Sequence, residues 1–310
     1  MTEQLKLKLN DSKATRWGAL VIVAFTMMAA YYVNDVVAPL KTMLETDLAW
    51  SSTDFGFFTG GYSFLNVFFL MLIWGGLILD RFGIRFTGKL ATILMVGGTA
   101  LEYYAMTGLA GADATLFGIN EIFGYKTGVF VAFAGYSIFG VGAEVAGITV
   151  SKIIAKWFKG KELATAMGVQ VALARIGSQA GYAVAIPLAR AFGISTPVLL
   201  GLVLLLGGMI AFFVFAVMDK KLDKQMEAAA IAAGTEDEEE KFSFKDVKNI
   251  LVNPGFWLIA LLCVLFYSCV FPFQKFASEL MIIKYGINEN VAGTFAGLPA
   301  LGALILTPVF

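Results

Sequence analysis

Long apolar runs separated by short polar segments extend along almost the whole chain. A helix that crosses a bilayer needs about 20 mostly apolar residues, so the pattern predicts an all-α membrane protein with eight spans. The last run reaches the end of the chain without a polar stop or a flanking charge, and we expect the chain to be truncated inside this eighth helix. The predicted spans are 17–39, 54–79, 90–109, 128–155, 164–191, 196–218, 255–279 and 291–310.

One long polar segment, 219–253, divides the spans into two groups. It carries the acidic block T-E-D-E-E-E-K, followed by a short stretch that predicts an amphipathic helix capped by Ser243 and ended by Pro254. The predicted domains are a cytoplasmic tail over 1–16, an N-terminal six-helix transmembrane bundle over 17–218, a cytoplasmic linker over 219–253, and helices 7 and 8 of an incomplete C-terminal bundle over 254–310.

Lysine and arginine are concentrated in alternate polar segments: the N-terminal tail, the 2–3 loop, the 4–5 region and the 6–7 linker. Such an excess marks the cytoplasmic side, so the N-terminus and the linker are predicted to be cytoplasmic. The first apolar run is too long for a signal peptide, which predicts a retained first helix. The lack of a targeting segment fits an integral multi-pass protein of a bacterial inner (plasma) membrane.

Composition narrows the class of protein. The chain is 58% hydrophobic and 15% charged, whereas soluble domains carry about 25% charged residues. Its net charge of zero gives no reason to expect a nucleic-acid partner. There is no histidine, and no Cys or Ser nucleophile lies beside a base, so we expect no enzyme activity, no metal and no other cofactor.

A polar hinge, W-G-G-L-I-L-D-R-F-G-I-R-F-T-G-K, interrupts the apolar pattern at 74–89. Its first half predicts the end of a membrane helix packed through Gly75 and Gly76. A bundle of helices with one end that opens and closes needs such a tight turn; a short cytoplasmic loop with basic anchors is the alternative. The second half gathers four charged residues, Asp80, Arg81, Arg85 and Lys89.

Two charges lie deep inside predicted spans. Glu144 is near the centre of 128–155, and Arg175 is near the middle of 164–191. A charge at the bilayer centre costs about 2.5–3.5 kcal/mol and usually serves a function. One interpretation is a cavity in which Glu144 holds the ammonium and Arg175 the carboxylate of a small zwitterion. The alternative is a permanent salt bridge that joins helices 4 and 5.

A polar stripe accompanies Arg175 along its helix, where Ser178, Gln179 and Tyr182 share its face over two turns. Small residues at several positions are expected to let neighbouring helices approach closely. These residues are Gly140, Gly142, Gly147, Gly177 and Gly181.

Five further polar residues are each open to two interpretations. Asn66 would reach the cavity or make an interhelical hydrogen bond. Asn34 and Asp35 would line an outer vestibule or cap the first helix. Glu102 is expected to snorkel or pair in the outer third of its helix, and Lys275 would meet substrate or snorkel to the surface.

The hinge resembles the loop between helices 2 and 3 of the major facilitator superfamily, whose signature is G-x-x-x-D-R-x-G-x-R. The position after the second glycine, often basic in that family, is Ile84 here. The resemblance implies the major facilitator fold, with a six-helix N-terminal bundle followed by the start of a C-terminal bundle. The residues that match the signature, and that would form a gate, are Gly76, Asp80, Arg81, Gly83 and Arg85.

Further stretches resemble the branch of the superfamily that includes the vertebrate lysosomal dipeptide carrier. They are W-F-K-G-K-E-L-x4-G-x-Q-x3-A-R-I-G-S at 157–178 and Y-S-F-L-N at 62–66. The resemblance implies that Glu144 and Arg175 contact the termini of a peptide. It also aligns the acidic residue that ends helix 1 with Asp35, although N-D-V-V-A-P-L here departs from the family's D-N-P-A-A-L. The predicted substrate-binding residues are Glu144, Arg175, Asn66, Tyr62, Gln179, Tyr182 and Asp35.

We therefore predict a secondary active or facilitative transporter that moves a small zwitterionic solute, a dipeptide or an amino-acid-like molecule, by alternating access. Glu144 or Asp35 would carry the proton if transport is proton-coupled. One alternative is a proton-coupled antiporter of organic anions or drugs, although the fifth helix lacks the Pro–Gly pair typical of that class. Another is a receptor or scaffold that keeps the carrier fold without transporting. The expected partners are the substrate and the lipid bilayer, and the expected state is a monomer.

Overall fold

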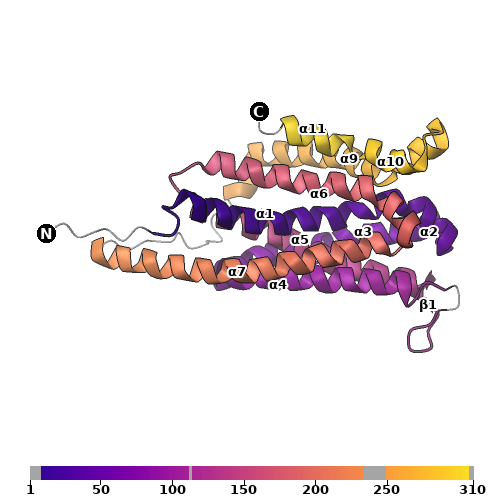
Figure 1. The fold of residues 1–310 in the computed structure, drawn as a ribbon, viewed down its shortest axis with the longest axis horizontal. Helices are drawn as coiled ribbons and strands as arrows, with labels where there is room; N and C mark the ends of the chain where they lie inside the picture. Colours follow the sequence, from indigo (N-terminus) through magenta and orange to yellow (C-terminus); the bar gives the residue numbers. More distant parts are fainter. Residues whose placement is uncertain (1–7, 112–113, 234–248, 307–310) are drawn as a thin grey trace.

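The computed structural model describes residues 8–111, 114–233 and 249–306, which form long helices running along one common direction (Figure 1). The long helices are α1 (Lys13–Val36), α3 (Ser52–Phe68), α4 (Met71–Thr107), α5 (Thr127–Trp157), α6 (Leu163–Phe192), α7 (Thr196–Ala233) and α9 (Pro254–Tyr285). The shorter elements are η1 (Ala38–Leu40), α2 (Lys41–Asp47), β1 (Glu121–Ile122), β2 (Tyr125–Lys126), α10 (Glu289–Ala296) and α11 (Leu298–Leu306).

The described helices can be compared with the predicted spans one by one. Every predicted span overlaps at least one helix, and 291–310 falls on α10 and α11. By length and composition, four of the described helices can cross a membrane, or five if the bent pair α3–α4 is one span. The helix that carries Arg175, α6, does not meet that composition. The predicted amphipathic helix from Ser243 lies largely outside the described residues.

The predicted turn between helices 2 and 3 lies at Gly83, within the range of α4. Gly83 has φ 75° and ψ 173°, a backbone conformation that is essentially restricted to glycine. The second predicted span is also broken, which the sequence did not reveal. Its two pieces, α3 and the start of α4, meet at Leu70, which has a left-handed φ of 51°, and the axes of α3 and α4 are bent by 58°.

Close helix contacts occur at most of the predicted small residues. A Cβ added at Gly140 would lie 2.4 Å from the Tyr62 carbonyl oxygen, and one at Gly177 would lie 2.1 Å from that of Met28. The same addition at Gly76 would meet no atom of the described residues within 4 Å. The predicted packing through Gly76 is therefore wrong, because that residue faces open space; its neighbour Gly75, against Val145, makes the contact.

One end of the bundle, which we call the basic end, carries residue 8, Gly83 and the turn between α5 and α6. The start of the chain is tied to that turn by ion pairs from Arg16 to Glu162, at 2.7 Å, and from Lys161 to Asp11, at 2.8 Å. The hydrogen bond from Arg16 lowers the pKa of Glu162 below its usual value. The sequence analysis did not predict these contacts.

A second cluster at the basic end joins α7 to α4 and α5. Asp219, whose side chain is fully buried, accepts hydrogen bonds from Lys156 Nζ at 2.8 Å and from Trp157 Nε1 at 3.0 Å. Arg85 of the signature lies 2.7 Å from Asp223 and 3.6 Å from Asp219. Among the described residues, Arg85 therefore joins α4 to α7, and its predicted role in a gate stays a prediction.

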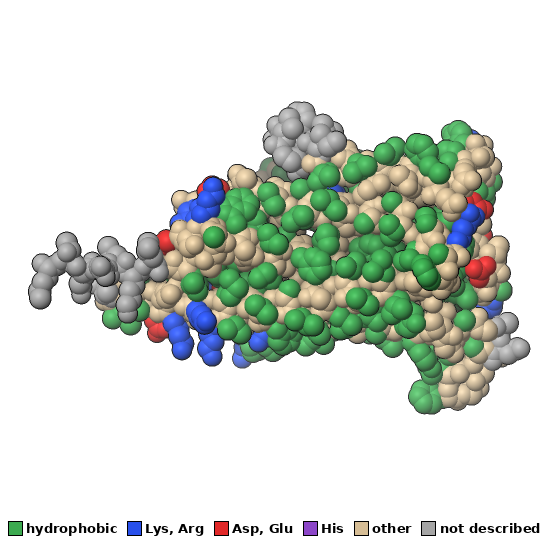
Figure 2. Space-filling view, in the orientation of Figure 1, with side chains coloured by type: hydrophobic (Ala, Val, Ile, Leu, Met, Phe, Trp, Pro, Cys, Tyr) green, Lys and Arg blue, Asp and Glu red, His purple; other side chains and the backbone are tan. Residues whose placement is uncertain are grey.

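The other end, which we call the opposite end, carries α2 and a short antiparallel hairpin of β1 and β2 within the loop that follows α4 (Figure 1). Charged side chains gather at the two ends of the face seen in Figure 2, and hydrophobic side chains cover the band between them. This distribution is the one expected when the middle of the molecule lies in lipid and its ends lie in water.

Replacing Gly83 by alanine tests the turn. The added Cβ is incompatible with the backbone at this position, so we expect Gly83→Ala to destabilise the protein by about 1–3 kcal/mol and to lower its Tm in detergent. The matched control is Gly76→Ala, seven residues earlier in the same signature, which should leave the Tm unchanged because its Cβ meets open space. Equal losses in the two variants would contradict the assignment of the turn to Gly83.

Candidate functional site

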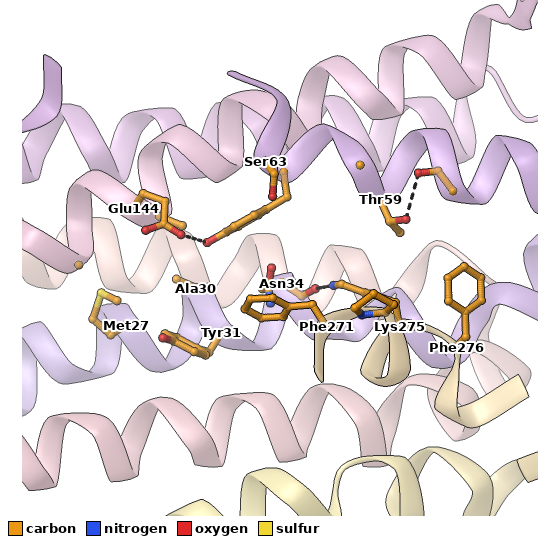
Figure 3. Close-up of a pocket in the computed structure, with 16 residues that line it drawn as sticks. Met27, Ala30, Tyr31, Asn34, Thr59, Ser63, Glu144, Phe271, Lys275 and Phe276 are labelled. Atoms are coloured by element: carbon orange, nitrogen blue, oxygen red, sulfur yellow. Dashed lines mark hydrogen bonds between the residues drawn. The ribbon is translucent and has the colours of Figure 1, made fainter. Parts of the chain in front are cut away.

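A cavity of about 500 Å³ lies between α1, α3, α5 and α9 (Figure 3). Pockets that bind small molecules typically measure about 300–1,000 Å³, so this one has room for a small solute. Its wall is mostly apolar and aromatic, with a few polar side chains among the apolar ones. The polar and charged residues of the wall are Tyr31, Asn34, Thr59, Tyr62, Ser63, Glu144 and Lys275.

Glu144 of α5 is half-buried and lines the cavity. Its carboxylate accepts a hydrogen bond of 2.8 Å from the Tyr62 hydroxyl of α3 (Figure 3). Asn66, one turn further along α3, donates its Nδ2 to the Tyr62 carbonyl oxygen at 3.0 Å, so this hydrogen bond lies within one helix and is not the interhelical bond considered from the sequence. Asn66 itself does not line the cavity. A carboxylate with one neutral donor keeps acceptor capacity for a cationic group of a ligand.

Arg175 of α6 lies in a second, smaller pocket of about 30 Å³. Its guanidinium carbon is 5.5 Å from the centroid of the Tyr31 ring, a cation–π distance. Asp35, Ser178 and Tyr182 line the same small pocket. The wall that both pockets share is made by Tyr31, Asn34 and Phe271.

Glu144 and Arg175 form no ion pair with each other within the part of the chain that the structure describes. The alternative of a permanent salt bridge between helices 4 and 5 is therefore not observed. Each charge instead lines a pocket. A carboxylate and a guanidinium left available in this way can each accept an oppositely charged group of a ligand.

Gln179 and Tyr182 turn toward α9, α10 and α11. The Tyr182 hydroxyl donates to the Gln274 carbonyl oxygen at 3.0 Å. A Cβ added at Gly297 would lie 2.3 Å from Gln179 Oε1. That oxygen is buried and has no hydrogen-bond partner among the residues that the structure describes. The polar stripe of α6 thus packs against the helices that follow the linker. It does not line the large cavity.

Several wall residues were not on the predicted list. Tyr31 and Asn34 of α1 line both pockets, and Lys275 of α9 lines the large one. Tyr136 of α5 is buried nearby and donates a hydrogen bond of 2.8 Å to the Asn34 carbonyl oxygen. Lys275 did carry a signal in the sequence, because it is a charge within a predicted span that could meet substrate. An aromatic residue in a span carries no such signal, because most spans contain several.

Glu102 of α4 is fully buried, and neither carboxyl oxygen has a hydrogen-bond partner among the described residues. The expectation that it snorkels or pairs is therefore wrong. The cause is its helical face, which points toward α5: a Cβ on Gly135 would lie 2.9 Å from the Glu102 backbone nitrogen. Within the described ranges, no group of three or more Cys, Asp or Glu side chains is arranged to hold a metal ion.

The signature residues lie at the basic end, away from the cavity wall. Asp80 pairs with Lys152 of α5 at 2.8 Å, and both side chains are about half-exposed. The Arg81 guanidinium carbon lies 5.6 Å from the ring centroid of its neighbour Phe82. In the described residues, Asp80 therefore contacts its own bundle, and its predicted role in a gate stays a prediction.

The fold and the sequence define the class of protein. The profile of the Major Facilitator Superfamily matches residues 20–310, and the helical structure is the one expected for that fold. The chain belongs to the major facilitator superfamily, a family of membrane transporters, and is an integral multi-pass membrane protein. The resemblance seen in the hinge and in the 157–178 stretch is confirmed at this level.

Its curated relatives are named lysosomal dipeptide transporter MFSD1. The human protein is 26% identical over 311 residues, which cover 96% of this chain and 60% of the relative. The zebrafish protein is 27% identical over 280 residues, covering 87% and 55%. The chicken protein is 31% identical over 189 residues, covering 57% and 40%. This chain thus spans about 60% of the length of the human relative.

These relatives are vertebrate proteins named for the lysosome, so they give no support to the bacterial inner membrane expected from the sequence. The identity of the membrane and the side on which the N-terminus lies stay predictions.

Glu102 offers a test of the cost of an unpaired buried carboxyl group. We expect Glu102→Met to raise the Tm, because a side chain of similar length removes two buried oxygens that lack partners, each costing about 1–3 kcal/mol. Glu102→Gln is the matched control, since it keeps two unpaired polar atoms and should bring a smaller gain. A lower Tm for Glu102→Met in a thermal melt would show that the carboxyl group has a stabilising partner after all.

Proposed function

We propose that this chain forms part of a transporter that moves a small zwitterionic solute by alternating access. The observation that carries the proposal is the cavity of about 500 Å³ whose wall holds the carboxylate of Glu144, bonded to the neutral Tyr62 hydroxyl, and the ammonium of Lys275, whose one ion pair among the described residues is a long one of 3.9 Å to Asp35. A buried charge without an opposite partner is unfavourable. A ligand that brings both signs of charge would relieve that cost at both positions.

The substrate we propose is a dipeptide or an amino-acid-like molecule. Its ammonium would bind Glu144, and Arg175 in the adjoining pocket would attract its carboxylate, as the sequence resemblance implies. The relatives are named dipeptide transporters, which favours a peptide-like zwitterion over an organic anion or a drug. The second transporter hypothesis is a proton-coupled antiporter of organic anions or drugs. Either Glu144 or Asp35 would be the proton carrier in a coupled mechanism.

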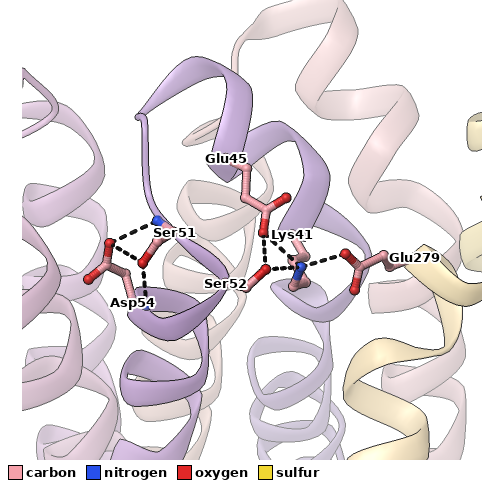
Figure 4. A network of polar contacts seen from close by, with 6 residues as sticks. All are labelled: Lys41, Glu45, Ser51, Ser52, Asp54 and Glu279. Carbon is pink, nitrogen blue, oxygen red and sulfur yellow. Dashed lines mark hydrogen bonds and ion pairs between the residues drawn. The ribbon is translucent and has the colours of Figure 1, made fainter. Parts of the chain in front are cut away.

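Contacts across the opposite end support alternating access. Lys41 of α2 is 2% exposed; its Nζ lies 2.5 Å from Glu279 of α9 and 2.7 Å from Glu45, and it donates to the Ser52 hydroxyl at 2.9 Å (Figure 4). The same Nζ is 5.9 Å from the ring centroid of Phe276, a residue of the cavity wall. We infer that this network closes the cavity at the opposite end.

A second ion pair, from Arg190 of α6 to Glu289 of α10, joins the same end. At the basic end the arrangement differs: the large side chains of α9 from Phe256 to Tyr267 are 39–69% exposed. Among the described residues, ion pairs thus join the N-terminal bundle to the helices after the linker at the opposite end, and none joins them at the basic end. A rocking motion that breaks the contacts at the opposite end and brings the basic end together would expose the cavity to each side in turn.

A receptor or scaffold with the carrier fold is the competing class. It would need neither an available charge in a cavity nor ion pairs between the two parts of the chain that break and re-form with a relative motion. Uptake into proteoliposomes separates the two classes. Saturable uptake of a neutral dipeptide by the full-length protein is the expected result, and no uptake of any zwitterion would favour the scaffold.

The role of Glu144 can be tested by Glu144→Gln, which keeps the shape of the side chain and removes its charge. We expect uptake of Ala-Ala to fall by at least tenfold, because a charge-assisted hydrogen bond contributes about 1.5–3 kcal/mol. The Tm should stay near that of the wild type. The matched control, Glu102→Gln, changes a buried glutamate outside the cavity and should leave uptake intact. Collapse of the Tm together with uptake would point to a structural role for Glu144.

The closure at the opposite end can be tested with a reporter cysteine at Thr59, in a background where Cys263 and Cys269 are replaced by serine. We expect Lys41→Met to increase labelling of Thr59→Cys by a membrane-impermeant maleimide applied from that end, because the contact with Glu279 is lost. As control, Lys126→Met changes a lysine at the same end that bonds only the Ala49 carbonyl oxygen among the described residues. Equal labelling with and without Lys41 would argue against this closure.

A further inference from the structure

Lys275 stands out among the charges of the large cavity. It is on α9, in the helices after the linker, and its side chain is 15% exposed. Its Nζ donates to the Asn34 carbonyl oxygen at 2.6 Å and to the Tyr136 hydroxyl at 3.1 Å. Both acceptors are neutral groups of the N-terminal bundle. A cation from one half of the molecule is thus inserted into the wall of the other half.

Among the described residues, the charge of Lys275 has only one ion pair, and that pair is long. Its nearest carboxylate is Asp35, at 3.9 Å, and Asp35 receives a shorter hydrogen bond, 2.8 Å, from Asn34 Nδ2. An ammonium has three donors, and two of them are used on neutral acceptors. A desolvated ammonium in this situation favours the arrival of an anionic group.

The position of Lys275 complements that of Glu144. In Figure 3 Glu144 lies at the left of the lined region and Lys275 farther to the right, with Asn34 and Phe271 between them. Arg175, by contrast, is absent from this wall and lines the neighbouring pocket of about 30 Å³. The neighbouring pocket is thus far smaller than the large cavity of about 500 Å³. In the conformation described here, the cation that a ligand in the large cavity would meet is therefore Lys275.

We propose that Lys275 binds the carboxylate of the zwitterionic substrate in the large cavity, while Glu144 at its other end binds the ammonium. This inference rests on the proposed function and moves the carboxylate from Arg175, in the neighbouring pocket, to Lys275 in the large cavity. It also assigns the two charged groups of the substrate to different parts of the molecule, since Glu144 is on α5 and Lys275 is on α9. A bound zwitterion would thus bridge the N-terminal bundle and the helices after the linker.

The test compares two probes that differ only in the carboxylate: the dipeptide Ala-Ala and its C-terminal amide. Binding of each to the full-length protein would be measured by calorimetry, for the wild type and for Lys275→Gln, Lys275→Arg and Arg175→Gln. We expect the wild type to prefer the dipeptide over the amide by about tenfold or more. Lys275→Gln should lose this preference while its affinity for the amide stays unchanged, and Lys275→Arg should restore at least part of it.

The outcomes separate the two proposals. Retention of the full preference by Lys275→Gln overturns the role of Lys275, most clearly if Arg175→Gln loses the preference instead. Loss of affinity for both probes in Lys275→Gln, with a lowered Tm, also overturns it in favour of a structural role in joining α9 to α1. A wild-type protein that binds neither probe overturns the proposed function itself.

Discussion

The structure depends on one constraint: a charged side chain within an apolar layer needs water, a partner or a cavity. Glu144, Arg175 and Lys275 meet it by lining pockets between helices, where aromatic rings and hydroxyl groups surround them. Asp35 accepts a hydrogen bond from Asn34 and forms a longer ion pair with Lys275. The charged side chains of these helices thus face the pockets, and many large hydrophobic side chains of the same helices lie on the outer surface of the molecule.

The same constraint explains why the charges are distributed over both parts of the chain. The N-terminal bundle contributes Glu144 and Arg175, and α9 contributes Lys275. If all three were in one bundle, they could neutralise one another within a rigid unit. Placed on two units that touch mainly at the opposite end, they can be brought together or separated by a relative motion of those units. A binding site of this kind is sensitive to the conformation of the carrier.

Local features of this fold could be predicted from the sequence, and features that depend on contacts between distant segments could not. The turn at Gly83 was predictable because charged residues and glycine follow each other between two apolar runs, and its φ of 75° requires glycine. Glu144 and Arg175 were visible as charges in apolar surroundings. The face toward which a side chain points was not visible. For that reason the expectations for Gly76 and Glu102 were wrong, and Tyr31 and Tyr136 were missed.

The geometry also favours a zwitterion over other solutes on energetic grounds. An anion would neutralise Lys275 and leave Glu144 desolvated, and a cation would do the reverse; each leaves one buried charge uncompensated, at a cost of a few kcal/mol. A neutral solute such as a sugar would leave the charges of both Lys275 and Glu144 uncompensated. Only a molecule with both charges, separated by roughly the length of the cavity, compensates both ends at once. The net charge of the occupied site is then the same as that of the empty one, so a change of conformation need not carry additional charge across the membrane.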